Sequence, residues 1–340
     1  MSASHSKNTK KFILLMIGLF ILLLIMFVIS INTGFMKIPL SEVWSAFFGQ
    51  DVGDQRLTIF EFRLPRIILS MLIGAGIAVA GGILQSITRN PLADPGIIGI
   101  NAGASFAVVL YTFLSGSATL TGTLSIFVMP FTALAGAFVA AILIYTISIK
   151  KGKVTPIRLI LVGIGINAAF ASGTLVLQMK MDPQDFTKTL TWISGSIWAT
   201  NWNFVLSTFI WLIILIPLAF FKARQLNVLT LGDSIAAGLG IHLEKERLKL
   251  LTIAVGLAGA CVSVGGGITF LGLIAPHIAR RLIGPLHERF LPLTALLGAC
   301  ILLIADTLGR VVMTPMELPV GIVISIIGAP YFIYLLMRTK

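Results

Sequence analysis

Charged residues are scarce in this sequence, and their scarcity excludes a soluble protein. They make up 11% of the 340 residues, whereas soluble domains carry roughly 25%. Hydrophobic residues make up 57%, and the mean hydropathy is +1.00. Because a membrane span needs about 20 apolar residues, the apolar runs fill most of the chain. The sequence therefore predicts an all-α polytopic membrane protein with one transmembrane domain over residues 1–340.

Catalytic and ligand-binding motifs are also missing. The sequence contains no Walker motif, no HExxH and no GxSxG, and its apolar runs contain no pair of carboxylates at helical spacing. Its two cysteines, Cys261 and Cys300, lie in apolar runs without metal or disulfide spacing, so we expect small buried hydrophobes. We therefore predict no enzymatic activity, no metal and no cofactor. An intramembrane enzyme would need a catalytic pair that this sequence does not offer.

Buried acids are rare too, which bears on the energy source of transport. Asp306 is the one clear acid within the apolar runs. Ion-coupled carriers normally place acids inside the membrane, although each costs roughly 3 kcal/mol or more. Energy must then come from another chain, and an ATPase on a separate polypeptide is the favoured source. A self-contained secondary carrier or a channel is the alternative class.

What the chain does contain is a series of about ten apolar runs, one of them short. We expect spans at residues 12–31, 64–87, 96–114, 123–149, 157–178, 203–221, 248–266, 268–282, 290–309 and 319–337. With residues 1–11 as a cytoplasmic tail, 18 of the 25 basic residues fall on the inner side, as the positive-inside rule requires. We therefore expect a multi-pass protein of the cell membrane with both termini in the cytoplasm. The net charge of +12 follows from topology and does not indicate nucleic-acid binding.

Small residues recur at intervals of four in the second expected span. Gly74, Ala78 and Gly82 share one helix face, which lets helix backbones approach closely in lipid. This spacing predicts a tightly packed bundle and says nothing about function.

A short polar stretch, Arg89–Gly96, separates the second and third expected spans. It contains two prolines and Asp94, and proline ends helices because it lacks an N–H. Such backbone at a membrane needs water or a protein cavity around it. From the residues alone, a tight cytoplasmic turn and an element of a transport pathway are both open.

The longest inner segment, residues 222–249, is expected to hold one or two short helices. Leu231, Ile235 and Leu239 fall on one face. Asp233 or Ser234 can cap the start, and Gly240 the end. The apolar face either folds back on the bundle or docks into a groove of a partner; the sequence leaves both open.

A glycine run at residues 265–267 precedes the short eighth span and predicts sharply bent backbone. The run lacks the spacing of a phosphate-binding loop. His277 has no His, Cys or acidic neighbour at metal-ligand spacing, so a structural or helix-terminal role is favoured.

Taken together, these residues resemble the FecCD family, the permease subunits of ATP-binding-cassette importers for iron–siderophores, haem and cobalamin. The resemblance runs from the first span to the C-terminus. It rests on five segments: Arg63–Arg66, Asn90–Gly96, Gly272–His277, Leu318–Val323 and Gly328–Pro330.

The resemblance implies a cobalamin-permease-like bundle of the type II ABC importers. Its expected partners are a second permease subunit, identical or homologous, a cytoplasmic ABC ATPase dimer, an extracytoplasmic substrate-binding protein and the lipid bilayer. Arg63, Arg66 and Arg310 match arginines that dock the binding protein, and Arg suits bidentate carboxylate contacts. We expect Arg63→Glu or Arg310→Glu to weaken docking while leaving folding intact. Anchoring of these arginines to lipid headgroups is the alternative.

The resemblance also assigns the inner side. Asn90 and Leu92 match the cytoplasmic gate, whose other half is expected around Thr155, Pro156 and Ile157. The sequence departs there, because Pro156 and Ile157 stand where the cobalamin permease has two small hydroxyl residues. The remaining assignments are an ATPase-coupling segment (Leu231, Gly232, Asp233, Ser234, Ile235, Ala237, Leu239 and Gly240) and a neighbouring cytoplasmic end (Pro276, His277, Arg280 and Arg281).

The expected mechanism is alternating access driven by the ATPase, with no chemistry done on the cargo. A ferric siderophore is the favoured cargo because it is the commonest in the family, with haem and cobalamin as alternatives.

Overall fold

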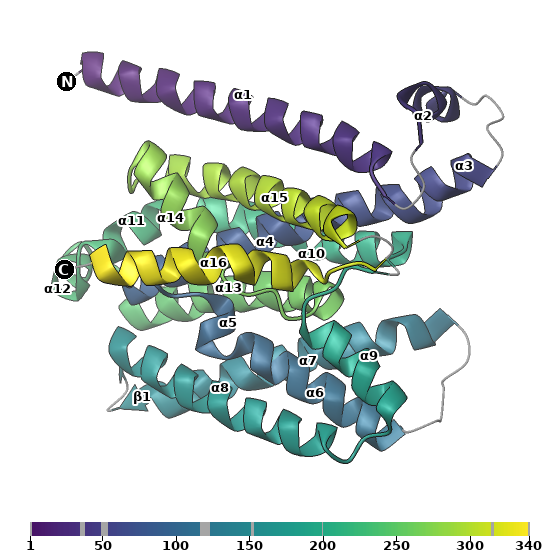
Figure 1. Ribbon diagram of the computed structural model, residues 1–340. Helices are drawn as coiled ribbons and strands as arrows, with labels where there is room; N and C mark the ends of the chain where they lie inside the picture. Colours follow the sequence, from purple (N-terminus) through teal and green to yellow (C-terminus); the bar gives the residue numbers. More distant parts are fainter. Residues whose placement is uncertain are drawn as a thin grey trace.

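The structure is a bundle of long helices (Figure 1). This computed structural model describes residues 2–34, 38–48, 54–115, 123–150, 153–198, 200–313 and 316–338. Among them, eight helices are long and apolar enough to cross a membrane. These eight are α1 (Ser2–Asn32), α4 (Leu64–Thr88), α7 (Thr123–Ser148), α8 (Pro156–Gln178), α10 (Trp202–Phe221), α13 (Leu243–Gly265), α15 (His287–Val312) and α16 (Val320–Arg338).

The other two expected spans correspond to shorter helices. The third begins with a single turn, α5 (Pro95–Ile98), and continues as α6 (Ile100–Ser115) after Gly99, whose φ of +106° breaks the helix. The eighth is α14 (Leu271–Ile283), whose 13 residues reach only about 20 Å, less than the ~30 Å of a hydrocarbon core. The predicted helical membrane fold is confirmed, with one broken span and one half-length span.

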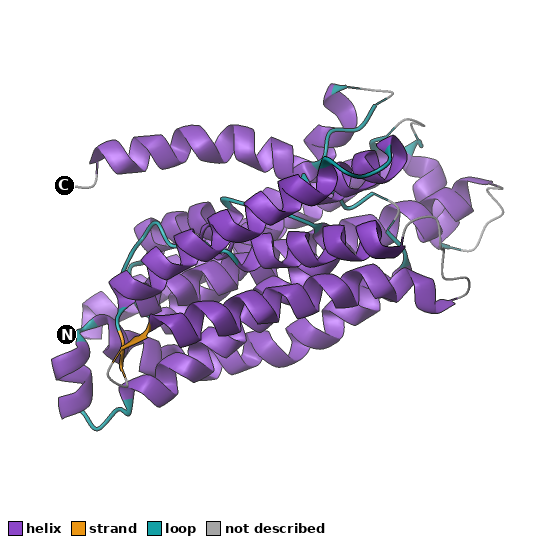
Figure 2. Ribbon diagram, turned by 90° about the horizontal axis from the view of Figure 1, so that it is seen from below, coloured by secondary structure: helices purple, strands orange, loops and turns teal. Residues whose placement is uncertain are grey.

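Short elements connect the spans. On one side lie α2 (Leu40–Phe47), α3 (Asp54–Leu57), the π-helix η1 (Thr58–Arg63) and α9 (Pro183–Ile193). On the other side lie α11 (Ala223–Thr230), α12 (Asp233–Gly238) and the two-residue strands β1 (Ile149–Lys150) and β2 (Lys153–Val154), which pair antiparallel. Both chain ends lie at the same end of the bundle as α12 and β1 (Figure 1), and a view turned by 90° agrees (Figure 2).

The bundle is organised around α4. In the most apolar stretch of α4, 78% of the residues are buried. In the most apolar stretch of α1 none is buried, and this helix lies along one edge of the bundle (Figure 1). The small-residue face predicted on α4 packs on α15: a Cβ on Gly74 would overlap the backbone of Gly298. Gly81 meets Gly272 of α14 in the same way. Backbone-to-backbone approach of this kind replaces the hydrophobic drive that helices lack in lipid.

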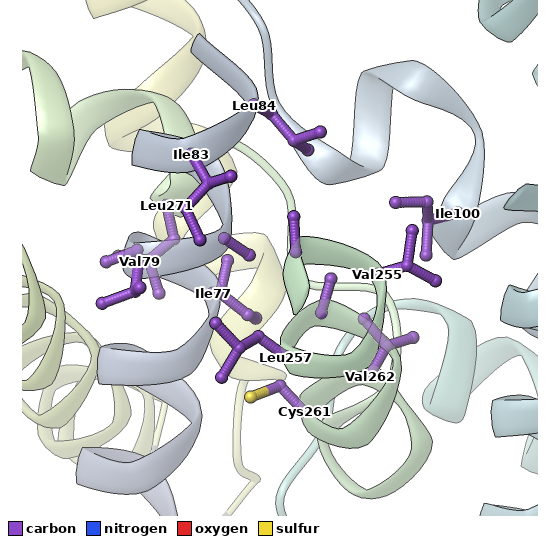
Figure 3. Packing of buried hydrophobic residues seen from close by; sticks show 14 of the residues in the cluster. Ile77, Val79, Ile83, Leu84, Ile100, Val255, Leu257, Cys261, Val262 and Leu271 are labelled. Atoms are coloured by element: carbon purple, nitrogen blue, oxygen red, sulfur yellow. The ribbon is translucent and has the colours of Figure 1, made fainter. Parts of the chain in front are cut away.

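Branched apolar side chains fill the space on the other side of α4. Figure 3 shows Ile77 of α4 beside Leu257 of α13, with Cys261 below, and Ile83 of α4 higher up beside Leu271 of α14. Cys261 and Cys300 are both buried, as the sequence predicted.

Candidate functional site

The three arginines expected to dock a binding protein lie together at the end of the bundle that carries α2 and α3. Arg66 forms ion pairs with Asp306 (2.9 Å) and Glu317 (2.7 Å), and Arg310 forms one with Asp306 (3.2 Å). The side chain of Asp306 is completely buried. The single acid expected within the spans is therefore neutralised by two arginines from α4 and α15 rather than available for ion coupling.

Two of these arginines also hold the end of α1. Arg310 donates to the carbonyl oxygens of Thr33 (3.0 Å) and Ser30 (3.2 Å) and to the Ser30 hydroxyl, and Arg63 donates to the carbonyl of Ile31. The last carbonyls of a helix lack partners within it and carry a partial negative charge, so arginines stabilise this end. Arg63 and Arg310 are only 7% and 5% exposed. A charge reversal at either position would bury a carboxylate among carbonyls, so the expectation that folding stays intact is corrected here.

The expected cytoplasmic gate is a tight turn after α4. Arg89 ends the helix in the left-handed conformation (φ +50°). The side chain of Asn90 accepts a hydrogen bond from the N–H of Leu92 (2.9 Å), and Asp94 caps α5 by accepting from the N–H of Gly96 (2.8 Å). These short-range bonds satisfy the backbone that Pro91 and Pro95 interrupt. Leu92 packs against a small cluster formed by Leu273, Ile274 and Leu335.

The second expected half of the gate adjoins the first. Thr88 at the end of α4 and Pro156 at the start of α8 line the same small pocket. Pro156 occupies the first turn of α8, where the missing N–H of proline costs no hydrogen bond. Ile157 is 72% exposed and points away from the bundle of this chain. The structure thus brings Pro156 beside Thr88, just before the gate turn, and leaves Ile157 on the surface.

Two of the sequence segments behind the family resemblance meet here. A Cβ on Gly272 would lie 2.8 Å from both the Asp94 carboxylate and the ring of Pro95. The Asn101 side chain donates to the carbonyl of Ile268 (3.1 Å), beside Gly266, whose positive φ of +68° confirms the bent backbone predicted at the glycine run. The gate turn is therefore packed directly on the bend that leads into α14.

The expected coupling segment forms two helices, α11 and α12. Leu231, Ile235 and Leu239 are 58%, 51% and 62% exposed, so the apolar face does not fold back on this chain. No side chain caps the start of α12, although Asp233 or Ser234 was expected to do so. Gly232 occupies the N-cap position, and Asp233 is the first residue of the helix. Gly240 (φ +81°) and the N–H of Ile241, which donates to the carbonyl of Ala236, end the helix, as predicted.

Asp233 is the centre of an ionic cluster that joins three elements. Its Oδ1 accepts from Arg89 of the gate turn and from Nη2 of Arg247 on α13 (2.7 Å). Arg247 also donates to the carbonyl of Val154 (3.0 Å), just before the second half of the gate. Partial burial raises the pKa of Asp233, but the hydrogen bonds and charges of the two arginines outweigh it and hold that pKa below its ordinary value. The carboxylate is therefore ionised at neutral pH.

The segment at Pro276–Arg281 lies in the C-terminal half of α14. Pro276 is buried, the His277 ring lies edge-on to Tyr331 at 5.8 Å, and the Arg280 guanidinium sits 4.8 Å from the centre of the Phe290 ring. Arg281 is exposed. Within the described residues, no group of three His, Cys, Asp or Glu side chains lies close enough to hold a metal.

Sequence reasoning missed several residues of this site. Arg89 and Arg247 were counted only as loop charges, and Glu244 was not considered. Asp233 was assigned to the coupling segment and considered as a cap, but its ion pairs were not anticipated. Arg89 and Asp233 are 144 positions apart, so no local pattern links them. An arginine at the helix end where glycine is usual was the one available signal. An open pocket of about 780 Å³ beside α9, lined in part by Trp192 and Trp198, was also not anticipated.

Comparison with known proteins gives matches along nearly the whole chain. The family model described as the FecCD transport family matches residues 22–338. The iron(3+)-hydroxamate import system permease protein FhuG of Bacillus subtilis (strain 168) is 55% identical over 334 residues, covering 98% of this chain and 99% of that protein. The iron-uptake system permease protein FeuC of the same organism is 41% identical over 321 residues, covering 94% and 96%.

A solved structure agrees with these matches. It is described as an inward-facing conformation of a metal-chelate type ABC transporter, and it superimposes with a TM-score of 0.82 and 29% identity, covering 95% of this chain and 99% of that one.

Proposed function

This chain belongs to the FecCD transport family, and we propose that it is the permease subunit of a binding-protein-dependent ABC importer for a ferric siderophore of the hydroxamate class. The proposed cargo rests on one observation: the chain is 55% identical to a permease described as belonging to an iron(3+)-hydroxamate import system, over 99% of that protein's length. The ATPase resides on a separate cytoplasmic chain, and a second permease subunit, identical or homologous, completes the passage. The subunit spans the cell membrane with both termini in the cytoplasm.

The mechanism is alternating access. A loaded binding protein docks at the α2–α3 end, and cargo enters a passage between the two permease subunits. ATP binding and hydrolysis on the partner chains move α12 and the gate turn around Asn90 and Leu92. The exposed apolar face of α12 supports this assignment, because an amphipathic helix of this kind fits a groove on another protein. Pro276–Arg281 forms a neighbouring cytoplasmic end.

Docking involves Arg63, Arg66 and Arg310, and the geometry distinguishes their parts. Arg66 and its partner Glu317 are the accessible pair, with side chains 13% and 37% exposed. When the binding protein docks, Arg66 releases Glu317 and pairs with an acidic residue of that protein instead. Arg63 and Arg310 remain bound to the end of α1. Affinity of the binding protein for Arg66→Glu, compared with the exposed Arg56→Glu on α3, tests this division. Equal affinity for both variants would count against docking at Arg66.

The experiment that tests the cargo is uptake of radiolabelled iron in a strain deleted for this chain. The panel consists of ferric hydroxamate and ferric catecholate siderophores, haem and labelled cobalamin. We expect loss of hydroxamate-bound iron alone, restored by the intact gene.

Other results of the uptake panel would change the assigned cargo or the assigned class of transporter. Lost haem or cobalamin uptake with intact siderophore uptake would assign the chain to that branch of the family. Uptake that persists for every compound, in a strain also lacking homologous permeases, would refute the proposed cargo. Uptake that survives removal of the ATPase would favour a secondary carrier.

A further inference from the structure

The helix that faces the ATPase in the proposed function is held to the bundle by very few groups. Of its apolar residues only Ala236 is buried, and the larger ones, such as Ile235 and Leu239, are exposed. Apart from its chain connections to α11 and α13, α12 is attached through the side chain of Asp233, at its first turn. This carboxylate therefore gives movement of α12 a direct side-chain route into the bundle.

On one side, Asp233 reaches the gate turn. Arg89 donates through one guanidinium nitrogen to Oδ1 of Asp233 and through Nε to the carbonyl of Leu229 at the end of α11 (3.0 Å). Arg89 and Asn90 are consecutive, and the backbone of Asn90 also caps α4 by donating to Gln85 (3.1 Å). Arg89 is thus a short, direct link from the α11–α12 junction into the gate.

On the other side, Asp233 reaches the start of α8. The same Oδ1 accepts from Nη2 of Arg247, whose Nη1 donates to the carbonyl of Val154. The N–H of Val154 in turn donates to Glu244 (3.3 Å), which lies 3.7 Å from Arg247. Val154 is followed by Thr155 and Pro156, the second half of the gate.

The charges of this cluster balance. Arg89 and Arg247 are paired with Asp233 and Glu244, and the Arg247 side chain is only 6% exposed. A charge-assisted network with a buried arginine keeps its geometry better than a flexible surface ion pair. Arg89 also adopts the left-handed backbone conformation that glycine normally takes at a helix end. The hydrogen bonds of its side chain to Asp233 and Leu229 offset the cost of that conformation.

We propose that Asp233 is a positioning residue that transmits movement of the ATPase-facing helix α12 to both halves of the cytoplasmic gate, through Arg89 to the turn at Asn90–Leu92 and through Arg247 to Val154–Pro156. This inference rests on the proposed function, because it assumes that α12 is where the ATPase acts. It adds the connection between coupling helix and gate, which is a single carboxylate oxygen shared by two arginines.

The test follows the gate without reference to cargo. A cysteine replaces Leu92, which is half-buried at the gate, and Cys261 and Cys300 give little background because both are buried. The complete transporter is reconstituted with its ATPase. Labelling by a membrane-impermeant maleimide is then timed with and without ATP under conditions that block hydrolysis. In the otherwise wild-type protein we expect the two labelling rates to differ on the order of tenfold. Couplings between linked sites typically change an equilibrium by roughly 5–150-fold.

Asp233→Asn keeps the shape of the side chain and removes its charge. We expect the ATPase to copurify normally and the ratio of labelling rates to fall to near one. Arg89→Gln breaks the same link from the gate side and should give the same loss, and the double variant should be no worse than either single variant. Glu246→Gln is the matched control. It is a carboxylate held by two lysines, Lys222 and Lys249, at the same end of the bundle but without contact to the gate turn. Its ratio should stay at the wild-type value.

Any of four results would overturn the proposal: an unchanged ratio in Asp233→Asn, an unchanged ratio in Arg89→Gln, a ratio near one in the otherwise wild-type protein, or loss of ATPase copurification in Asp233→Asn, which would make Asp233 a docking contact. The proposed cargo fails separately, through the uptake panel, since the labelling assay contains no siderophore.

Discussion

At the residue scale, the most consequential charge is Asp306, because it is fully buried between two arginines. Removing one member of a buried ion cluster costs about 3–5 kcal/mol, since the partners keep their desolvation penalty without compensation. We predict that Asp306→Asn lowers the stability of the purified chain by this amount and loosens α1, whose end depends on Arg310. Thermal unfolding in detergent measures the loss.

Glu317 is the control for this prediction. It binds the same Arg66 but is 37% exposed, and exposed ion pairs contribute about 0–1 kcal/mol. Glu317→Gln should therefore unfold close to the wild-type temperature. Equal shifts in the two variants would show that burial does not set the energy of this cluster.

At the element scale, the contact between α4 and α14 depends on glycine. A Cβ at Gly81 would overlap the backbone of Gly272, and a backbone contact cannot yield without a helix shift. We predict that Gly81→Ala lowers stability by about 1–3 kcal/mol, the usual cost of overpacking. Gly18→Ala on the edge helix α1, where a Cβ meets nothing within 4 Å, should leave stability unchanged or raise it slightly, because alanine favours the helix more than glycine does. Folded yield after membrane extraction, with thermal unfolding, compares the two.

A second prediction at this scale concerns α12. Replacing Leu231, Ile235 and Leu239 with serine removes the exposed apolar face without touching the buried bundle. We expect the chain to fold normally while copurification of the ATPase falls on the order of a hundredfold, as when several central apolar contacts of an interface are lost.

The control is Met316→Ser. Met316 is an apolar residue at the opposite end of the bundle and is at least as exposed as Leu231, Ile235 and Leu239. Normal assembly of the triple variant with the ATPase would show that α12 is not the coupling helix.

How far the sequence predicted these elements depends on the range of the forces involved. Eight of the ten expected spans and the small-residue face of α4 were predicted correctly, because hydrophobic length and four-residue spacing are local. The break at Gly99 was missed, since it depends on the positive φ of one residue. The burial of Arg63 and Arg310 was missed because their partners are backbone carbonyls at the end of α1, which leave no trace in the sequence. Likewise Asp233 was read as a cap, although its charge is bound by Arg89 and Arg247.

At the scale of the whole molecule, the charges and the fold agree on one orientation. The ends of the chain, α12 and β1 share one end of the bundle (Figure 1), and the basic loops expected inside the cell belong to that end. Membrane insertion keeps such basic segments in the cytoplasm. In the orientation we propose, the opposite end, with α2, α3 and α9, faces outward, which puts the Arg66 cluster on the side where the proposed binding protein would arrive.

This orientation predicts a reciprocal labelling pattern. Single cysteines are placed at Ala237 on α12 and at Gln184 on α9, both exposed, and an impermeant thiol reagent is added to vesicles of either orientation. The cysteine at position 237 should react only in inside-out vesicles and the one at position 184 only in right-side-out vesicles, because the reagent cannot cross lipid. The parent chain, with only the buried Cys261 and Cys300, serves as the background control. The reverse pattern would place the Arg66 cluster in the cytoplasm and so remove both the docking and the coupling assignments together.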